Sequence, residues 1–310
     1  MTLLLGIVPF PNLVQIVYAD DPVIISNDPT GGNCTLVGIW DINTETCTLS
    51  ANLGEPVVIN GNGITFDCQG NSITGVTGEG NGIFIDGMRG VTVKNCTVDG
   101  FLHQFQIINS NRINLLHNTA LNSGDFSNTI GFFVSGSSNV TLDSNTAQNH
   151  DFGADVGGTR NTLVNNSISD NQNGIQLSGT HNVVDNNTVN NNSANFGIGV
   201  SGSRNIVREN SLFGNGNAGI LIEGNNNKVI GNTSSNNIQD GIKITTLFGE
   251  ATGNTVLGNI ANNNASFGFE DETTGSKTAG TANTYRNNTC LENLSGGSTP
   301  AGLCNDIPTP

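Results

Sequence analysis

The sequence predicts an all-β solenoid of about nine to ten coils, and three observations lead to this fold class. Residues 197–218 and 219–240 are two copies of one unit, GIGVSGSRNIVRENSLFGNGNA and GILIEGNNNKVIGNTSSNNIQD. Each copy has two short apolar strands separated by turns of Gly, Ser and Asn, with no stretch long enough for a helix. Charged residues make up only 11% of the chain and aromatic residues 5%, while Gly occurs 41 times, which is unlike a helix-rich domain.

An Asn that closes the second strand marks the repeat along most of the chain. Stacked coils place equivalent residues above one another at about 4.8 Å, so roughly nine coils would make a rod of about 40 Å. We expect the marker Asn side chains to form a ladder of hydrogen bonds, and a second Asn column to do the same before the second strand. The first column is Asn95, Asn118, Asn145, Asn166, Asn187, Asn210, Asn232, Asn259 and Asn288, and the second is Asn139, Asn161, Asn182, Asn205 and Asn227.

Alternation in the first strand of each coil predicts which side chains line the interior. Gln176, Gly199, Leu221 and Lys243 are expected on the outer face. The inward pairs are expected to be Ile175 with Leu177, Ile198 with Val200, Ile220 with Ile222, and Ile242 with Ile244.

The ends of the chain differ from the repeat. Residues 1–19 are uncharged and apolar and end in Val-Tyr-Ala, which is typical of a signal peptide; an apolar end strand is the alternative. Residues 20–50 are expected to form an N-terminal cap hairpin that covers the open edge of the stack. The solenoid itself is expected over 51–290, with a C-terminal cap or tail over 291–310.

Six cysteines fall into three pairs that are close in sequence, which favours disulfides and an oxidising compartment. None has the spacing of a structural zinc site. The second pair falls at related positions of the repeat and is therefore expected to join neighbouring coils. The predicted pairs are Cys34 with Cys47, Cys68 with Cys96, and Cys290 with Cys304.

The net charge of −15 argues against nucleic acid or an anionic membrane as the main partner. After residue 19, no apolar stretch is long enough to cross a bilayer. We therefore expect an extracellular or cell-surface protein whose partner is an extracellular glycan or a cell-surface matrix. The oligomeric state does not follow from the sequence.

Residues 47–75 (CTLSANLGEPVVINGNGITFDCQGNSITG) and 81–101 (NGIFIDGMRGVTVKNCTVDGF) carry a family resemblance. They resemble the start of NosD-like proteins of the pectin-lyase-like superfamily, and the similarity extends over about residues 47–290. The resemblance implies a single-stranded right-handed parallel β-helix. It implies no single function, because such repeats occur in enzymes, adhesins and tailspikes.

Catalytic motifs of enzymes with this fold are largely missing. The only Asp-Asp pair is Asp20-Asp21, outside the repeats, and no text matches the Tyr-Gly-x-Asp-Pro-His-like motif that the resemblance associates with epimerases. The segment most similar to that motif contains His150, Asp151 and Asp155. As a catalytic hypothesis, His150 would be the general base or acid, Asp151 would orient it and Asp155 would bind sugar hydroxyls or a cation; solvated turn residues are the alternative. A second candidate site on the early coils would consist of Asp86, Arg89, Lys94 and His103, with exposed surface residues as the alternative.

A basic column is a candidate binding site. Arg160, His181 and Arg204 each precede an Asn of the second column at steps of 21 and 23 residues, so they should stack. With Lys228 they could form a stripe for an anionic glycan; exposed turn residues that splay into solvent are the alternative. Two longer turns, residues 121–129 and 245–253, are expected insertions and could frame a binding face.

The sequence supports no cofactor, and calcium is possible but unsupported because no cluster of Asp accompanies an Arg in phase. We expect a carbohydrate-binding or structural, adhesive protein without a recognisable catalytic site. The alternative is a polysaccharide lyase, C5-epimerase or glycoside hydrolase that acts on an acidic polysaccharide with an atypical site.

Overall fold

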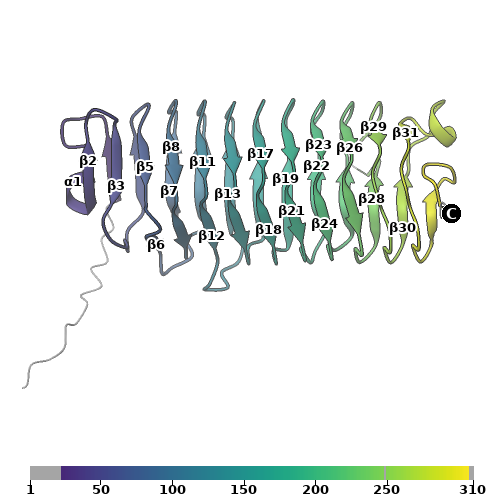
Figure 1. Ribbon diagram of the computed structural model, residues 1–310, viewed down its shortest axis with the longest axis horizontal. Helices are drawn as coiled ribbons and strands as arrows, with labels where there is room; N and C mark the ends of the chain where they lie inside the picture. The colour runs from purple at the N-terminus through teal and green to yellow at the C-terminus, as the bar shows by residue number, and fades with distance from the viewer. Residues whose placement is uncertain (1–21, 248, 307–310) are drawn as a thin grey trace, which may run out of the picture.

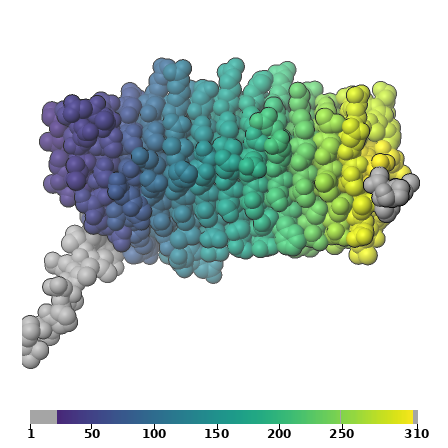
Figure 2. All heavy atoms as spheres, in the orientation of Figure 1, coloured from purple at the N-terminus to yellow at the C-terminus, as the bar shows by residue number. Residues whose placement is uncertain are grey.

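A computed structural model of the protein describes residues 22–247 and 249–306 and shows an elongated rod of stacked coils (Figures 1 and 2). The predicted signal peptide, residues 1–19, lies outside the described residues. Three sheets, which we name A, B and C, run along the rod. Twelve strands at about 4.8 Å give sheet A a length of roughly 50 Å, because both end segments add strands to the predicted coils.

Sheet A is parallel throughout, and each of its strands belongs to a different coil. In order along the rod it contains β1 (Val23–Ser26), β4 (Val57–Asn60), β7 (Asn81–Asp86), β10 (His103–Ile108), β13 (Ile130–Ser135), β16 (Phe152–Val156), β19 (Asn173–Leu177), β22 (Phe196–Val200), β25 (Ala218–Ile222), β28 (Asp240–Ile244), β30 (Phe267–Asp271) and β32 (Gly296–Thr299).

Sheet B is parallel except at its first pair of strands. In order it contains β2 (Gly38–Asp41), β3 (Thr46–Leu49), β5 (Thr65–Asp67), β8 (Thr92–Lys94), β11 (Asn114–Leu116), β14 (Thr141–Asp143), β17 (Thr162–Val164), β20 (Val183–Asp185), β23 (Ile206–Arg208), β26 (Lys228–Ile230), β29 (Thr255–Leu257) and β31 (Thr284–Arg286).

Sheet C gives most coils a third strand, whereas the sequence predicted two. Its strands have only three residues, of which one points inward, such as Val189 between Thr188 and Asn190. So short an alternation does not stand out from a polar turn. In chain order the sheet contains β6 (Ser72–Thr74), β9 (Thr97–Asp99), β12 (Thr119–Leu121), β15 (Thr146–Gln148), β18 (Ser167–Ser169), β21 (Thr188–Asn190), β24 (Ser211–Phe213) and β27 (Thr233–Ser235).

The interior is a continuous apolar core between the three sheets. All four predicted inward pairs, from Ile175 with Leu177 to Ile242 with Ile244, are at most 1% exposed, which confirms the predicted alternation. Phe105 and Phe132 stack on neighbouring coils with ring centroids 4.8 Å apart. This spacing is the inter-strand distance, so equivalent side chains pack in columns as expected.

The two ends of the rod are closed by disulfide-bonded segments. At the N-terminal end, the short helix α1 (Cys34–Val37) leads into the antiparallel hairpin β2–β3, and Cys34 is bonded to Cys47. The hairpin continues into sheet B because β3 pairs with β5 in parallel. At the C-terminal end, beyond the 3-10 turn η1 (Thr278–Gly280), Cys290 is bonded to Cys304, and Cys290 lies against Gly297 of β32.

Buried Asn ladders occupy all three corners of the coil. In each ladder, the side-chain oxygen of one Asn accepts the backbone N–H of its counterpart in the preceding coil, as Asn187 Oδ1 does from Asn166 at 2.9 Å. The ladders are Asn118, Asn145, Asn166, Asn187, Asn210, Asn232, Asn259 and Asn288; then Asn161, Asn182, Asn205, Asn227, Asn254 and Asn283; and then Asn171, Asn192, Asn215, Asn237, Asn264 and Asn293.

Two predicted ladder residues were wrong, and the third ladder was not predicted. Asn95 and Asn139 lie one residue before the ladder position, where the backbone is left-handed with φ of 56° and 55°. The positions that pair with the ladders are Cys96 and Val140, whose N–H groups donate to Asn118 and Asn161. Asn suits both positions, since it tolerates left-handed backbone and its amide can bond locally, so the sequence alone does not separate them.

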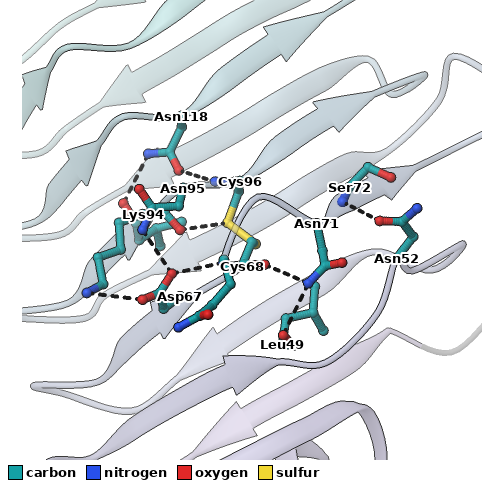
Figure 3. The surroundings of a disulfide bond; sticks show 12 residues. Leu49, Asn52, Asp67, Cys68, Asn71, Ser72, Lys94, Asn95, Cys96 and Asn118 are labelled. Carbon is teal, nitrogen blue, oxygen red and sulfur yellow. Dashed lines mark hydrogen bonds and ion pairs between the residues drawn. A yellow bond between two sulfur atoms is a disulfide. The ribbon is translucent and has the colours of Figure 1, made fainter.

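Figure 3 shows how the first ladder ends. Cys96 holds the ladder position, and its sulfur is bonded to Cys68 of the preceding coil. Asn95 donates from Nδ2 to Asp67 Oδ1 at 3.0 Å, and Lys94 forms an ion pair with the same carboxylate at 3.1 Å. The disulfide therefore replaces one rung of side-chain hydrogen bonds and joins neighbouring coils.

Candidate functional site

His150, the centre of the catalytic hypothesis, lies inside the solenoid wall. It occupies the position of the third ladder, and its backbone N–H donates to Asn171 Oδ1 at 2.9 Å. The side chain is 2% exposed, with Nδ1 3.2 Å from Thr129 Oγ1 and 3.4 Å from Gln104 Nε2. Burial lowers the pKa of His150 to about 4, so the imidazole is neutral at pH 7.

The other two members of the hypothesis point elsewhere. Asp151 accepts hydrogen bonds from the Thr129 backbone N–H at 3.0 Å and from Gln172 Nε2 at 2.7 Å, and none from His150. Asp155 projects from β16 onto the outer face of sheet A, between Phe133 and Gln176 of the adjacent strands. The structure therefore separates Asp155 from the other two, whereas His150 and Asp151 line one pocket, which is described below.

Apolar side chains gather on the outer face of sheet A, separately from the core. Phe196, Ala218 and Leu221 are 7%, 0% and 8% exposed and pack together, with Phe152 against them. We call these four residues the sheet A patch. The sequence predicted Leu221 on the outer face correctly, but the outer face is not a solvated surface there. Outward positions of a solenoid are ordinarily polar, so this nearly buried apolar cluster is a local departure from the repeat.

A pocket of about 550 Å³ adjoins the sheet A patch and extends to the insertion that begins at residue 245. We call it the Glu223 pocket. Its size is that of a small-molecule or oligomer subsite. Its lining residues are Asn195, Phe196, Asn217, Leu221, Glu223, Lys243, Thr245, Thr246, Leu247 and Glu272.

The charged groups in and beside this pocket differ in whether they have an ion-pair or hydrogen-bond partner. Lys243 Nζ lies 2.9 Å from Glu270 Oε2 and 3.0 Å from Glu272 Oε1. Burial lowers the pKa of Lys243, but hydrogen bonds to the two carboxylates outweigh it and raise the pKa above its usual value. Burial raises the pKa of Glu223, and no described side chain is within hydrogen-bonding or ion-pairing distance of its carboxylate.

The insertion over 121–129 lines a second pocket, of about 440 Å³. Phe126 forms one wall, and Asp125, Asp151 and Asp170 supply carboxylates around it. Both insertions that the sequence identified therefore border pockets. Among residues 22–247 and 249–306, no group of three or more His, Cys, Asp and Glu side chains is arranged to hold a metal ion.

The basic column has the predicted stacking. Arg160, His181 and Arg204 are exposed residues with left-handed backbone at the corner between sheets A and B. The residues just before them, Thr159, Thr180 and Ser203, bridge in parallel, so the three occupy equivalent places. Lys228 does not extend this column, since it lies in β26 opposite Ile206, and the next place in the column is held by Asn226.

The early group is also dispersed. Asp86 and His103 lie on strands of sheet A, Lys94 pairs with Asp67 on sheet B, and Arg89 is at the corner between these sheets. His103 stacks on Phe133 with ring centroids 5.0 Å apart, on the same outer face as Asp155.

No helix in the described part of the chain has the length and apolarity to span a bilayer.

Sequence reasoning missed Phe152, Phe196 and Glu223. A signal was available: aromatic residues directly precede Gly at the first position of the sheet A strands, as in Phe196-Gly197 and Phe152-Gly153. Glu223 follows its strand where other coils have Ser201 and Thr245. In a repeat, a departure from the column is more informative than the residue type itself.

This arrangement of three parallel sheets around an apolar core defines a parallel β-helix. The chain belongs to the right-handed β-helix family, whose model, "Right handed beta helix region", matches residues 81–233 and 153–305. A search of curated proteins finds no match.

Solved structures with the same fold include two Azotobacter vinelandii enzymes. The A-module of mannuronan C-5 epimerase AlgE4 aligns with a TM-score of 0.60 at 13% identity, covering 85% of this chain and 88% of that chain. The AlgE6 A-module aligns at 0.58 and 16%, covering 86% and 81%. An α-1,3-glucanase from Streptomyces thermodiastaticus aligns at 0.58 and 15%, covering 94% and 70%. At these identities the likeness concerns the fold.

Proposed function

We propose that the protein is a secreted or cell-surface glycan-binding β-helix whose binding surface is the outer face of sheet A. The observation behind the proposal is the sheet A patch, an apolar cluster outside the core and beside the Glu223 pocket. Sugar rings have apolar C–H faces and a rim of hydroxyls, so they suit apolar walls with a few polar groups. Glu223 and Asn195 supply those groups in the pocket, and Gln176 does so beside the Phe196 ring, above Gly199.

Two further observations support this proposal. The similar solved structures include proteins described as mannuronan C-5 epimerases and an α-1,3-glucanase, so rods of this shape serve polysaccharides elsewhere. Three disulfides in one chain favour an oxidising location such as the cell exterior. Cleavage of an export signal after Ala19 is part of the same proposal.

The test is binding to a panel of neutral, acidic and amino-sugar oligosaccharides, followed by NMR. Phe196→Ala should weaken binding by at least about tenfold, because it removes a ring from the patch. Phe213→Ala is the matched control, since Phe213 is 49% exposed on sheet C. Equal affinity of both variants for the bound glycan, or no binding to any glycan, would contradict the proposal.

A polysaccharide-processing activity is the second candidate, favoured by His103 and Asp155. Both lie on the outer face of sheet A, two strands apart and offset by three residues along the strand, or about 14 Å between Cα atoms, and the His103 ring stacks on Phe133 of the strand between them. Burial lowers the pKa of His103 and raises that of Asp155, so both shifts bring the two groups closer to the ranges that a general base and a general acid need. The same NMR series would detect product, and loss of turnover in Asp155→Asn with binding retained would support catalysis.

A further inference from the structure

We propose that the Glu223 pocket recognises the ammonium group of an unacetylated amino sugar. The inference rests on the proposed glycan-binding function and narrows it to one substrate class. It differs from the anionic glycan expected from the basic column, because the pocket next to the apolar patch carries the opposite charge.

The floor of the pocket is held in place by the sheet beneath it. Phe196 and Leu221 are 7% and 8% exposed and form the apolar side of the pocket. The Phe196 ring lies over Gly199: a Cβ at Gly199 would come within 2.8 Å of the ring. A glycine on the outer face thus lets the ring lie close to the sheet, at the edge of the pocket.

The pocket leaves one carboxylate available. Among the described residues, Glu272 accepts hydrogen bonds from Thr245 Oγ1 at 2.6 Å and Thr246 N at 3.1 Å and also pairs with Lys243. Glu270 is occupied by Lys243 as well. The Glu223 side chain, half-buried against the same pocket, has no such donor within the described part of the chain. A ligand donor would therefore fill a position that the protein leaves open.

Charge complementarity selects the ligand. Lys243 is already neutralised by two carboxylates, so the pocket with Glu223 is net negative. A uronate would bring its own carboxylate against Glu223, which like charges disfavour. An ammonium group would form a charge-assisted hydrogen bond with Glu223 while its ring packs on Phe196. An N-acetylated sugar would keep the ring contact but offers only a neutral amide.

The experiment compares a glucosamine hexamer with its fully N-acetylated counterpart and with an oligogalacturonate of equal length, by calorimetry on the intact protein. We expect the glucosamine oligomer to bind tightest. Glu223→Gln should weaken its binding by about tenfold or more while leaving the acetylated oligomer unchanged. Glu209→Gln is the matched control, because Glu209 is an exposed corner residue on another face and the charge change is identical.

The outcomes separate this inference from the proposed function. If the acetylated oligomer binds as tightly as the glucosamine oligomer, or if Glu223→Gln does not change their ratio, the amino-sugar inference is wrong. Glycan binding that remains sensitive to Phe196→Ala in that case would leave the proposed function standing. If no oligosaccharide binds, both fail. Unchanged thermal unfolding of Glu223→Gln shows that the variant is folded.

Discussion

At the residue scale, each corner of the coil uses two residues for two tasks. The first turns the chain with left-handed backbone, as Asn186 does at φ of 52°, and the second, Asn187, is buried and bonds to the coils on either side. Asn187 Nδ2 donates to Leu163 O and to Asn210 Oδ1, both at 3.0 Å. Corner N–H groups that would otherwise be buried without a partner are thereby satisfied.

Replacing a ladder residue should therefore cost more than replacing its neighbour. We expect Asn187→Ala to lower the free energy of unfolding by about 3 kcal/mol, since it leaves buried donors and acceptors unpaired. Asn186→Ala should cost less, about 1 kcal/mol, from the left-handed backbone and the exposed hydrogen bond that Asn186 Nδ2 donates to Asn165 Oδ1 at 2.8 Å. Urea denaturation of the two variants measures this difference, and equal losses would show that the ladder is not the source of the stability.

His150 makes stability depend on pH. The pKa of the folded protein's His150 is about 4 and the unfolded value is near 6.5, so between these values only the unfolded state takes up the proton. Stability should thus fall by up to about 3 kcal/mol as pH drops from about 6.5 to about 4. His150→Asn, which restores the ladder residue, should flatten this dependence.

The measurement is the urea concentration at the midpoint of unfolding, at pH 7 and pH 4.5, for the wild type, His150→Asn and His181→Asn. His181→Asn, the same substitution at an exposed corner, is the matched control. An unchanged slope in His150→Asn would mean that His150 is not the titrating group.

The sequence predicts the repeat well, but it does not show which of two adjacent corner residues joins the ladder. Inward residues such as Ile198 and Val200 were predicted correctly because burial imposes a strict alternation. Asn95 and Asn139 were misplaced by one residue because Asn fits both corner positions. The catalytic hypothesis placed His150 and Asp155 in one site because they are close in sequence. In the structure the His150 side chain is buried within the coil, whereas Asp155 projects from the outer face of sheet A. Phe196 and Glu223 line one pocket because neighbouring coils stack, and only the register of the strands reveals this.

At the element scale, the Cys68–Cys96 disulfide stands where the first ladder would otherwise continue toward the cap. It closes a loop with a sequence separation of 28 residues. Its loss should cost about 3 kcal/mol, mainly because the unfolded chain gains freedom. The neighbouring rung is intact, since Asn118 Oδ1 still accepts the Cys96 N–H at 3.0 Å.

An Asn should partly replace this disulfide. We expect Cys68→Ser with Cys96→Asn to be more stable than Cys68→Ser with Cys96→Ser by about 1 kcal/mol, because the new amide can donate to Asn118 Oδ1. Thermal unfolding of the two double variants, compared with the wild type, measures the difference. If the Ser and Asn variants unfold together, position 96 does not act as a ladder position.

At the scale of the whole molecule, the disulfides lie at the ends and the middle depends on the ladders. Cys34–Cys47 and Cys68–Cys96 hold the N-terminal coils, and Cys290–Cys304 holds the last. Each coil contacts only its neighbours, so local opening should begin at the ends. Between these bonds, the described coils contain no covalent link other than the chain itself.

Reduction should therefore loosen the rod from its ends. In hydrogen exchange after treatment with a reductant, we expect faster exchange in residues 34–96 and 284–305 and little change over 140–240. Cys-free variants of the end pairs should reproduce the pattern without reductant. Uniform acceleration along the rod would instead indicate one cooperative unit.

The equal spacing of the three ladders has a consequence for length. From one coil to the next, Asn161, Asn166 and Asn171 are followed by Asn182, Asn187 and Asn192, each 21 residues later. A duplication of any such 21-residue block keeps all three ladders continuous, and the 27-residue steps from Asn227 to Asn254 and from Asn232 to Asn259 show that a longer turn leaves the ladders intact as well. Adding or removing one whole coil should therefore change the length of the rod by about 4.8 Å and leave both end segments unchanged.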